Sequence, residues 1–280
     1  MKRTVRRAFP LFVLPTLIAF IVGFIIPFVM GVYLSFQKFT VVTNTKFVGL
    51  GNYVKMLGDE SFIHSLWYTV LFTVVSVITI NVFAFVIALF LCKTFKGTRL
   101  FRTIFFMPNL IGGIVLGYIW QIILNGILAH WNITLQYDAK YGFWGLIILM
   151  NWQQIGYMMI IYIAGIMSVP TELLESAMID GAGSFERLKS VVIPILRPSI
   201  TICTFLTLTN GFKLFDQNLA LTGGEPAKSS EMLALNIYNT FYGRVGWQGV
   251  GQAKAVIFTI IVAVIAFIQL YATRSKEEQM

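Results

Sequence analysis

The sequence predicts an all-α membrane protein with six transmembrane helices. Apolar residues make up 57% of its 280 residues and charged residues only 12%, roughly half the charged share of a soluble domain. Six long stretches contain no Asp, Glu, Lys or Arg, and a helix of about 20 such residues crosses the ~30 Å hydrocarbon core of a bilayer. The composition therefore excludes a secreted disulfide scaffold, a disordered chain and a typical soluble enzyme.

The first predicted helix, at about 11–35, follows a basic N-terminus that looks like the start of a signal peptide. Its apolar stretch is far longer than the ~7–15-residue core of a signal peptide and lacks a small-residue cleavage site, so we expect a retained span. The next three helices are placed at about 68–91, 104–124 and 145–166. Each lies in a charge-free stretch that is longer than one span and must include some interfacial loop.

The fifth predicted helix is unusual because its charge-free part, 198–212, is too short to cross a bilayer. The prediction therefore extends it to 198–219, through Lys213 and Asp216. A sixth helix at about 254–272 completes the set, and no further run supports a seventh. We expect residues 1–280 to form a single transmembrane domain.

Basic residues predict the orientation of these spans, because Lys and Arg are enriched in cytoplasmic segments. With both termini in the cytoplasm, 13 of the 21 Lys and Arg residues lie inside and 7 outside. The inner set is Lys2, Arg3, Arg6, Arg7, Lys93, Lys96, Arg99, Arg102, Arg187, Lys189, Arg197, Arg274 and Lys276. The outer set is Lys38, Lys46, Lys55, Lys140, Lys228, Arg244 and Lys254. The net charge of +9 is thus mostly an orientation signal and needs no nucleic acid. The dense cluster from Lys93 to Arg102 fits that interpretation, with a contact to anionic lipid as a minor addition.

Cysteine and histidine carry no chemistry in this sequence. Cys92 and Cys203 each lie in an apolar run and are expected to be unpaired core thiols. His64 and His130 have no cluster of carboxylates beside them, so no metal site is expected.

The segment 167–197, between the fourth and fifth spans, is too long for a simple connection. Pro170 ends the preceding helix, and Thr171 is a plausible N-cap for a short helix with Glu172 in its first turn. An apolar stripe then follows at helical spacing and comprises Leu173, Leu174, Ala177 and Met178. Gly181 and Gly183 end that helix, and a second one is expected over 184–192. So short a helix is marginal in water and needs a partner surface.

This loop resembles the signature of importer permeases of ATP-binding-cassette (ABC) transporters. The matching residues are Glu175-Ser176-Ala177, then Gly181 after three intervening residues, Val191 after nine more, and Ile193-Pro194. The family has Ala, Ile and Leu in place of Ser176, Val191 and Ile193. These substitutions exchange small or apolar residues and preserve the shape of the loop. The resemblance implies a type I importer permease whose coupling helix sits in a groove of a cytoplasmic ATPase. The residues it assigns to coupling are Glu172, Glu175, Ser176, Ala177, Asp180, Gly181 and Ala182.

Further motifs are similar to carbohydrate-uptake permeases, over about residues 8–275. They are Phe47-Val48-Gly49-Leu50-Gly51-Asn52-Tyr53, 102–108, Gly117-Tyr118-Ile119-Trp120, Asp180-Gly181-Ala182, Leu221-Thr222-Gly223-Gly224-Glu225-Pro226, and Asn236-Ile237-Tyr238 with Phe241. The Thr-Gly-Gly stretch, in which Glu225 is inserted before the proline, resembles the "first" permease of maltose- and glycerol-phosphate-type systems. Such a subunit pairs with a different, related "second" permease.

Polar residues in the fourth and fifth spans are the candidates for a substrate pathway. Lys213 and Asp216, at i and i+3 on the predicted helix, can pair on one face. Alternatively both sit at the outer interface with Lys213 snorkelling. Amides and aromatic rings suit sugar hydroxyls and ring faces. By resemblance to maltose-type permeases, in which these stretches line the sugar pocket, the assigned residues are Asn151, Gln154, Tyr157, Asn210, Lys213 and Asp216.

The resemblance implies a non-catalytic permease subunit of a sugar or oligosaccharide importer in a bacterial or archaeal plasma (inner) membrane. Its expected partners are a second permease, a dimeric cytoplasmic ABC ATPase that holds ATP and Mg²⁺, an extracellular or periplasmic binding protein, the sugar and the lipid bilayer. The chain has no G-x-x-x-x-G-K-[ST] motif and is expected to bind no cofactor itself. The binding protein would meet the outer loops 37–67, 125–144 and 220–253.

Other classes of function remain as alternatives. An ABC permease for a polyamine, phosphate or metal would carry the same loop signature. A membrane-embedded enzyme, such as a lipid-modifying transferase or an intramembrane protease, would need paired carboxylates, H-E-x-x-H or a Ser/His pair, and Asp216 stands alone in its span. A secondary transporter is disfavoured because no inverted repeat is evident.

Overall fold

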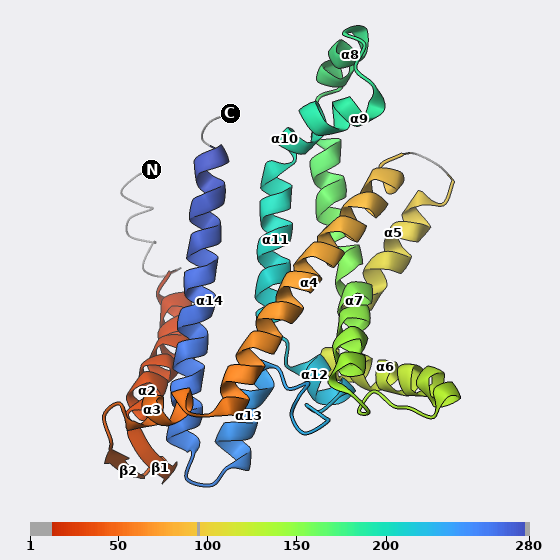
Figure 1. Cartoon of the computed structure of the whole chain (residues 1–280). Coiled ribbons are helices and arrows are strands. Elements are labelled where there is room, and N and C mark those ends of the chain that lie inside the picture. The colour runs from red at the N-terminus through yellow and green to blue at the C-terminus, as the bar shows by residue number, and fades with distance from the viewer. Residues whose placement is uncertain (1–12, 94–95, 278–280) are drawn as a thin grey trace, which may run out of the picture. The chain divides into compact units, whose positions relative to one another are not determined.

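The computed structural model describes residues 13–93 and 96–277, and its elements are helical apart from one β-hairpin (Figure 1). Backbone contacts divide the chain into two compact units. The first holds the described residues up to Phe62 together with Ile237–Ile261. The second holds Ile63–Asn236 and the described residues from Val262 onward. The predicted basic residues Lys2, Arg3, Arg6 and Arg7 lie outside the described residues.

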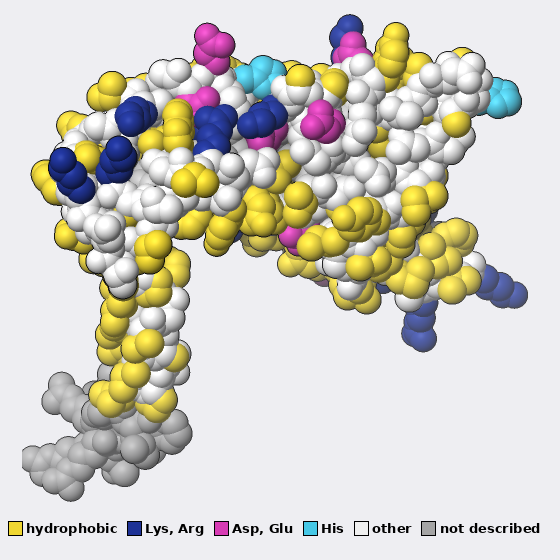
Figure 2. Space-filling view, turned by 90° about the horizontal axis from the view of Figure 1, so that it is seen from below, with side chains coloured by type: hydrophobic (Ala, Val, Ile, Leu, Met, Phe, Trp, Pro, Cys, Tyr) yellow, Lys and Arg dark blue, Asp and Glu magenta, His cyan; other side chains and the backbone are white. Residues whose placement is uncertain are grey.

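The first unit begins with a membrane-length helix, Val13–Ser35, that includes a π-helical turn at Ile21–Ile25 and helix α2 at Ile26–Ser35. None of its most apolar window is buried, and hydrophobic side chains cover it in Figure 2. A hairpin of β1 (Gln37–Val41) and β2 (Asn44–Phe47) and the short helix α3 (Gly51–Leu57) follow. The hairpin was not predicted, although the segment is rich in the β-branched residues that favour strands.

Asn52 explains one of the motifs that suggested the family. Its Nδ2 donates to the backbone oxygens of both Ser35 and Gln37, at 2.8 Å each. The Tyr53 hydroxyl lies 2.7 Å from Ser35 Oγ. These bonds fix α3 against the end of α2, where carbonyl groups would otherwise lack partners.

Most of the helices belong to the second unit. Three of them (α4, α13 and α14) continue from one unit into the other. The longer elements are α4 (Glu60–Leu91), α5 (Thr98–Phe106), α6 (Gly113–Leu128), α7 (Ala139–Met167), α11 (Arg197–Phe212), α13 (Leu233–Gly243) and α14 (Gln248–Glu277). The shorter ones are η2 (Met107–Leu110), η3 (Ala129–Trp131), α8 (Thr171–Ile179), α9 (Ser184–Arg187), η4 (Leu188–Val192), α10 (Ile193–Ile195) and α12 (Asp216–Leu221).

Among the described residues, five helices are long and apolar enough to span a membrane, and a bent pair brings the number to six. The five are Val13–Ser35, Glu60–Leu91, Gly113–Trp131, Ala139–Met167 and Gln248–Gln269, and the pair is Ser184–Ile195 with Arg197–Phe212. Six apolar segments were predicted. Helices α4, α7 and α14 begin six to eight residues earlier than predicted. Two other segments are interrupted where a continuous helix was predicted.

The third span is not the continuous helix predicted at 104–124. Helix α5 ends at Phe106, a 3₁₀ turn follows, and α6 begins only at Gly113. Pro108 has no N–H to donate to a continuing helix, and Ile111 and Gly112 adopt extended backbone angles. The sequence is apolar throughout this segment, so its hydropathy does not indicate the break.

The fifth span is not the helix predicted at 198–219. It bends by 71° at the break before Arg197 and ends at Phe212. Lys213 forms the C-cap, and a separate helix, α12, starts at Asp216, whose carboxylate suits a helix N-terminus. Lys213 and Asp216 are therefore not on one helix. Both are exposed and they form no ion pair with each other.

Glycines set the closest helix contacts of the second unit. A Cβ added at Gly156 on α7 would lie 1.8 Å from the Phe105 carbonyl oxygen on α5. On α6, Gly113 and Gly117 face Asp216, Gln217 and Ala220 of α12, again with no room for a side chain. The spacing of the two glycines is the small-xxx-small pattern that permits close packing of membrane helices.

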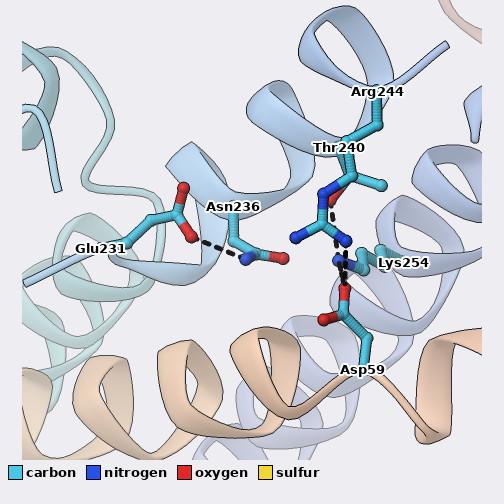
Figure 3. A network of polar contacts seen from close by, with 6 residues as sticks. All are labelled: Asp59, Glu231, Asn236, Thr240, Arg244 and Lys254. Atoms are coloured by element: carbon cyan, nitrogen blue, oxygen red, sulfur yellow. Dashed lines mark hydrogen bonds and ion pairs between the residues drawn. The ribbon is translucent and has the colours of Figure 1, made fainter. Parts of the chain in front are cut away.

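A charge cluster lies in the first unit (Figure 3). Asp59, just before α4, accepts hydrogen bonds from Lys254 Nζ on α14 at 2.7 Å and from Arg244 Nη1 at 3.1 Å. Lys254 also donates to Thr240 Oγ1 at 2.7 Å and lies over the Phe62 ring. We call Asp59, Arg244 and Lys254 the clamp, because these residues join the beginnings of α4 and α14 to the end of α13. A separate hydrogen bond, from Asn236 Nδ2 to Glu231 Oε2 at 2.7 Å, belongs to the second unit.

Candidate functional site

The loop between α7 and α11 ends its first helix with a Schellman motif. Helix α8 starts at Thr171, one residue earlier than predicted, and its N-cap is Pro170 in place of Thr171. At its end, the Ala182 N–H donates to the Ala177 carbonyl at 2.9 Å and the Gly181 N–H to the Met178 carbonyl at 3.1 Å. Gly181 has φ +83°, the left-handed conformation that this motif requires. The spacing of Ala177 and Gly181 in the sequence motif is therefore the spacing of a helix end.

The same loop exposes a cluster of large apolar side chains. Ile179 is 87% exposed and Phe185 77% exposed, and Met178 and Leu173 are also largely exposed. Of the predicted stripe, Leu174 turns inward and packs against the core of the second unit. Leu173, Met178 and Ile179 lie on α8, which Leu174 fixes to the rest of the second unit, and Phe185 lies on α9. Exposed apolar clusters of this kind mark interaction surfaces.

Acidic side chains surround this cluster. Glu172, Glu175 and Asp180 are all exposed, and none forms an ion pair within the described part of the chain. Ser176 is exposed and Ala177 is half-buried. The Ser176 carbonyl accepts from the Asp180 N–H at 3.0 Å. The seven residues assigned to coupling are therefore brought together on one helix and its turn.

The helices that flank this loop pack closely where they meet it. A Cβ at Gly165, near the end of α7, would lie 2.3 Å from Ser199 Oγ, near the start of α11. Val191, Val192 and Ile195 anchor the second half of the loop on the core. A displacement of α8 would therefore act on both flanking helices.

Two of the predicted pathway residues meet each other. Asn210 Nδ2 on α11 donates to Gln154 Oε1 on α7 at 3.3 Å. Both helices belong to the second unit, so this contact joins the two helices on either side of the coupling loop. Tyr157, one turn further along α7, is half-buried with its ring 6.4 Å from that of Phe106.

Asn151 points to a different partner. Its Nδ2 donates to Thr79 Oγ1 on α4 at 2.9 Å, while its buried Oδ1 has no partner. It lines a cavity of about 470 Å³ between α4 and α7, with Phe83, Trp144 and other apolar side chains. Asn151 therefore bonds to α4, whereas Gln154 bonds to α11. Neither Lys213 nor Asp216 forms an ion pair within the described part of the chain.

Sequence reasoning missed two polar junctions between helices. Gln217 Nε2 on α12 donates to Gln153 Oε1 on α7 at 2.8 Å. Asn81 on α4 bonds to both helices that flank the loop. Its Nδ2 donates to Thr207 Oγ1 at 3.0 Å, and its Oδ1 accepts from the Tyr162 hydroxyl at 2.8 Å. An amide inside an apolar run was the available signal for Asn81, because such groups commonly link membrane helices.

The Thr-Gly-Gly motif after α12 is a turn organised by Asn218. Asn218 Nδ2 donates to Thr222 Oγ1 at 2.9 Å and to the Ser230 carbonyl at 2.8 Å. Gly223 and Gly224 both have positive φ, which explains the two glycines. The motif is therefore explained by backbone geometry.

A multi-pass helical fold with a short helix exposed between two packed spans is the arrangement expected of a type I importer permease. The chain matches the family described as "binding-protein-dependent transport system inner membrane component" over residues 93–276. It is 42% identical to the probable starch degradation products transport system permease protein AmyD of Thermoanaerobacterium thermosulfurigenes, with 96% of this chain and 95% of that protein covered. This protein belongs to the family of binding-protein-dependent transport system inner membrane components.

One further relative and one solved structure are also similar to this chain. The multiple sugar-binding transport system permease protein MsmF of Streptococcus mutans is 30% identical over 95% of both chains. The fold matches a chain of a bacterial ABC transporter involved in the import of the polysaccharide alginate. The TM-score is 0.83 at 20% identity, covering 98% of each chain.

Proposed function

We propose that this chain is one of two related permease subunits of an ATP-driven importer for a sugar or oligosaccharide. The α8 helix carries the proposal, because it presents an exposed apolar cluster on a rigid Schellman-ended helix between α7 and α11. A dimeric ABC ATPase on the cytoplasmic side would receive this helix in a groove. In this proposal both termini lie in the cytoplasm of a bacterial or archaeal cell, whose plasma (inner) membrane holds the complex.

ATP hydrolysis then belongs to the partner and not to this chain. Closure of the ATPase would push α8, and α7 and α11 would carry the displacement into the membrane. Asn81 and the Gln154–Asn210 pair connect these helices to each other and to α4. A transition of this kind needs one element with two arrangements, and the loop with its flanking helices is that element.

The proposed cargo rests on the relatives and on the polar groups within the spans. AmyD and MsmF are named for starch degradation products and for multiple sugars. Amide groups at Asn151, Gln154 and Asn210, with Tyr157, supply donors, acceptors and a ring face suited to a sugar. Lys213 and Asp216, exposed at the ends of α11 and α12, would lie at the mouth of the pathway.

This chain would form only half of the pathway. The span Val13–Ser35 leaves its apolar surface uncovered within the chain. The cavity beside Asn151 is open and has one unpaired buried oxygen. A second permease would complete the pathway, and an extracellular or periplasmic binding protein would deliver the sugar to the outer loops.

The test is ATP hydrolysis by the purified complex, reconstituted with its binding protein and starch-derived oligosaccharides. We expect sugar-loaded binding protein to stimulate hydrolysis, and we expect Glu175→Lys to abolish the stimulation while the complex remains assembled. Glu60→Lys, the same change at an exposed position at the start of α4, is the control. Normal stimulation in Glu175→Lys would refute the coupling assignment, and purification of this chain with no ATPase would refute the function.

A further inference from the structure

We propose that a groove beside Arg102, between α5 and α7, binds the headgroup and upper acyl chain of an acidic phospholipid. The groove has a volume of about 280 Å³ and is lined by Arg102, Thr103, Phe106 and Ile160. The groove lies within the second unit, and the residues that α5 contributes to it all precede the break at Pro108. The proposal depends on this protein being embedded in a membrane and not on what it transports.

Arg102 is held in place but incompletely bonded. Its Nη2 donates to the Leu91 carbonyl, in the last turn of α4, at 2.7 Å. Its Nε is buried and has no acceptor. A buried N–H without an acceptor is unfavourable, and an oxygen that enters the groove would supply one. The paired N–H groups of a guanidinium match two oxygens of a phosphate.

The charge around Arg102 selects an anion. Lys93, Lys96 and Arg99 are exposed, and none of these four cations forms an ion pair within the part of the chain that the structure describes. The sequence has no acidic residue between Glu60 and Asp138. A cluster of cations next to a membrane span attracts anionic lipid. If these cations served only to orient the protein in the membrane, their positive charges would be sufficient. The groove beside Arg102 would then have no role.

The apolar walls favour a lipid over free phosphate. Phe106 and Ile160 form the wall beyond the guanidinium. The adjacent side chains of α5 are apolar and exposed, among them Ile104 and Phe105. A phosphodiester placed at Arg102 would therefore direct its acyl chain along a surface that already faces hydrocarbon. Inorganic phosphate would leave this wall uncovered.

The experiment is photolabelling of the assembled complex in liposomes. The probe is phosphatidylglycerol with a diazirine in its acyl chain, and peptide mapping by mass spectrometry locates the label. We expect label on the peptides that contain Phe106 and Ile160, and about tenfold less with the matching phosphatidylcholine probe or with Arg102→Gln. Arg99→Gln, which removes the same charge from an exposed position of the same helix, should reduce labelling by less than about threefold.

A second variant separates the headgroup from the acyl chain. Ile160→Trp fills the groove while Arg102 stays, so we expect it to reduce labelling at Phe106 about tenfold as well. Ile114→Trp, at an exposed position of α6, is its control and should label normally. Equal labelling by the two lipid probes, unchanged labelling in both Arg102→Gln and Ile160→Trp, or competition by millimolar inorganic phosphate would overturn the proposal. A finding that the complex does not transport sugar would not contradict lipid binding at this groove.

Discussion

Lys254 Nζ lies 2.7 Å from Asp59 Oδ2, and the Lys254 side chain has no exposed surface at all. The pair therefore links the start of α4 to α14 within the first unit. Arg244, which is 29% exposed, is the outer member of the same clamp. A buried charge becomes strongly unfavourable when its partner is removed. Substitutions in the clamp should therefore destabilise this unit.

Removal of one buried partner should destabilise the protein strongly. We expect Asp59→Asn to cost about 3–5 kcal/mol, because Lys254 then keeps its buried charge without its carboxylate. Lys254→Met in the Asp59→Asn background should cost much less than it does in the wild type. Thermal unfolding of the detergent-solubilised complex measures both effects. Lys55→Met, at an exposed lysine of α3, is the control, and an equal loss in Lys55→Met and Lys254→Met would contradict the account.

The clamp also predicts a pH dependence. Burial alone raises the pKa of Asp59, but the hydrogen bond from Lys254 and the charges of Lys254 and Arg244 outweigh it and lower the pKa below 3.8. A carboxyl with a lowered pKa stabilises the folded state above its unfolded pKa and loses that effect as the pH falls through the folded value. The stability difference between wild type and Asp59→Asn should be constant from pH 7 to about 5 and shrink below about pH 4. A difference that already shrinks near pH 6 would contradict the lowered pKa.

The turn after α8 should be sensitive to backbone conformation and not to side-chain volume. A Cβ at Gly181 or at Gly183 meets no atom within 4 Å, but only Gly181 has positive φ. Gly181→Ala should therefore cost about 1–2 kcal/mol at the helix end and reduce sugar-stimulated ATP hydrolysis by roughly 5- to 30-fold. Gly183→Ala is the matched control and should behave as wild type. Equal effects of the two changes would show that the left-handed turn is unimportant.

The contact between α5 and α7 should tolerate no side chain. Gly156→Ala would place a carbon 1.8 Å from a backbone oxygen, so the two helices must separate. Overpacking of this kind costs about 1–3 kcal/mol or more, and we expect a lower yield of assembled complex by size-exclusion chromatography. A Cβ at Gly126 on α6 meets nothing within 4 Å, so Gly126→Ala should assemble normally. Normal assembly of Gly156→Ala would mean that the helices are further apart than described.

The sequence predicted the presence and order of the apolar segments, because each must satisfy the thickness of a bilayer. It also predicted a short helix that ends at a glycine turn between the fourth and fifth apolar segments, because the glycine end of a short helix is a local signal. The breaks in the third and fifth spans were missed, since hydropathy is the same for a helix and for an interrupted one. The hairpin at Gln37–Phe47 was missed because it lies in a loop that was never assigned an element.

Polar pairs between helices were the hardest feature to predict. Asn81 and Thr207 are 126 residues apart, and nothing in either local segment indicates the other. On α7, successive residues differ by about 100° around the helix axis. Gln153 therefore meets Gln217 while Gln154 meets Asn210. A residue assigned by resemblance can be correct in type and still face a different helix.

Cross-linking from Ile179 tests the central claim most directly. A photoreactive amino acid at position 179, in the apolar cluster of α8, is activated in cells, and the partner is identified by mass spectrometry. Leu57, which is exposed on α3 in the predicted outer loop, provides the control position. The account predicts a cross-link from position 179, and none from position 57, to a subunit that carries a P-loop ATPase motif. Cross-links to that ATPase from position 57, or none from position 179, would contradict it.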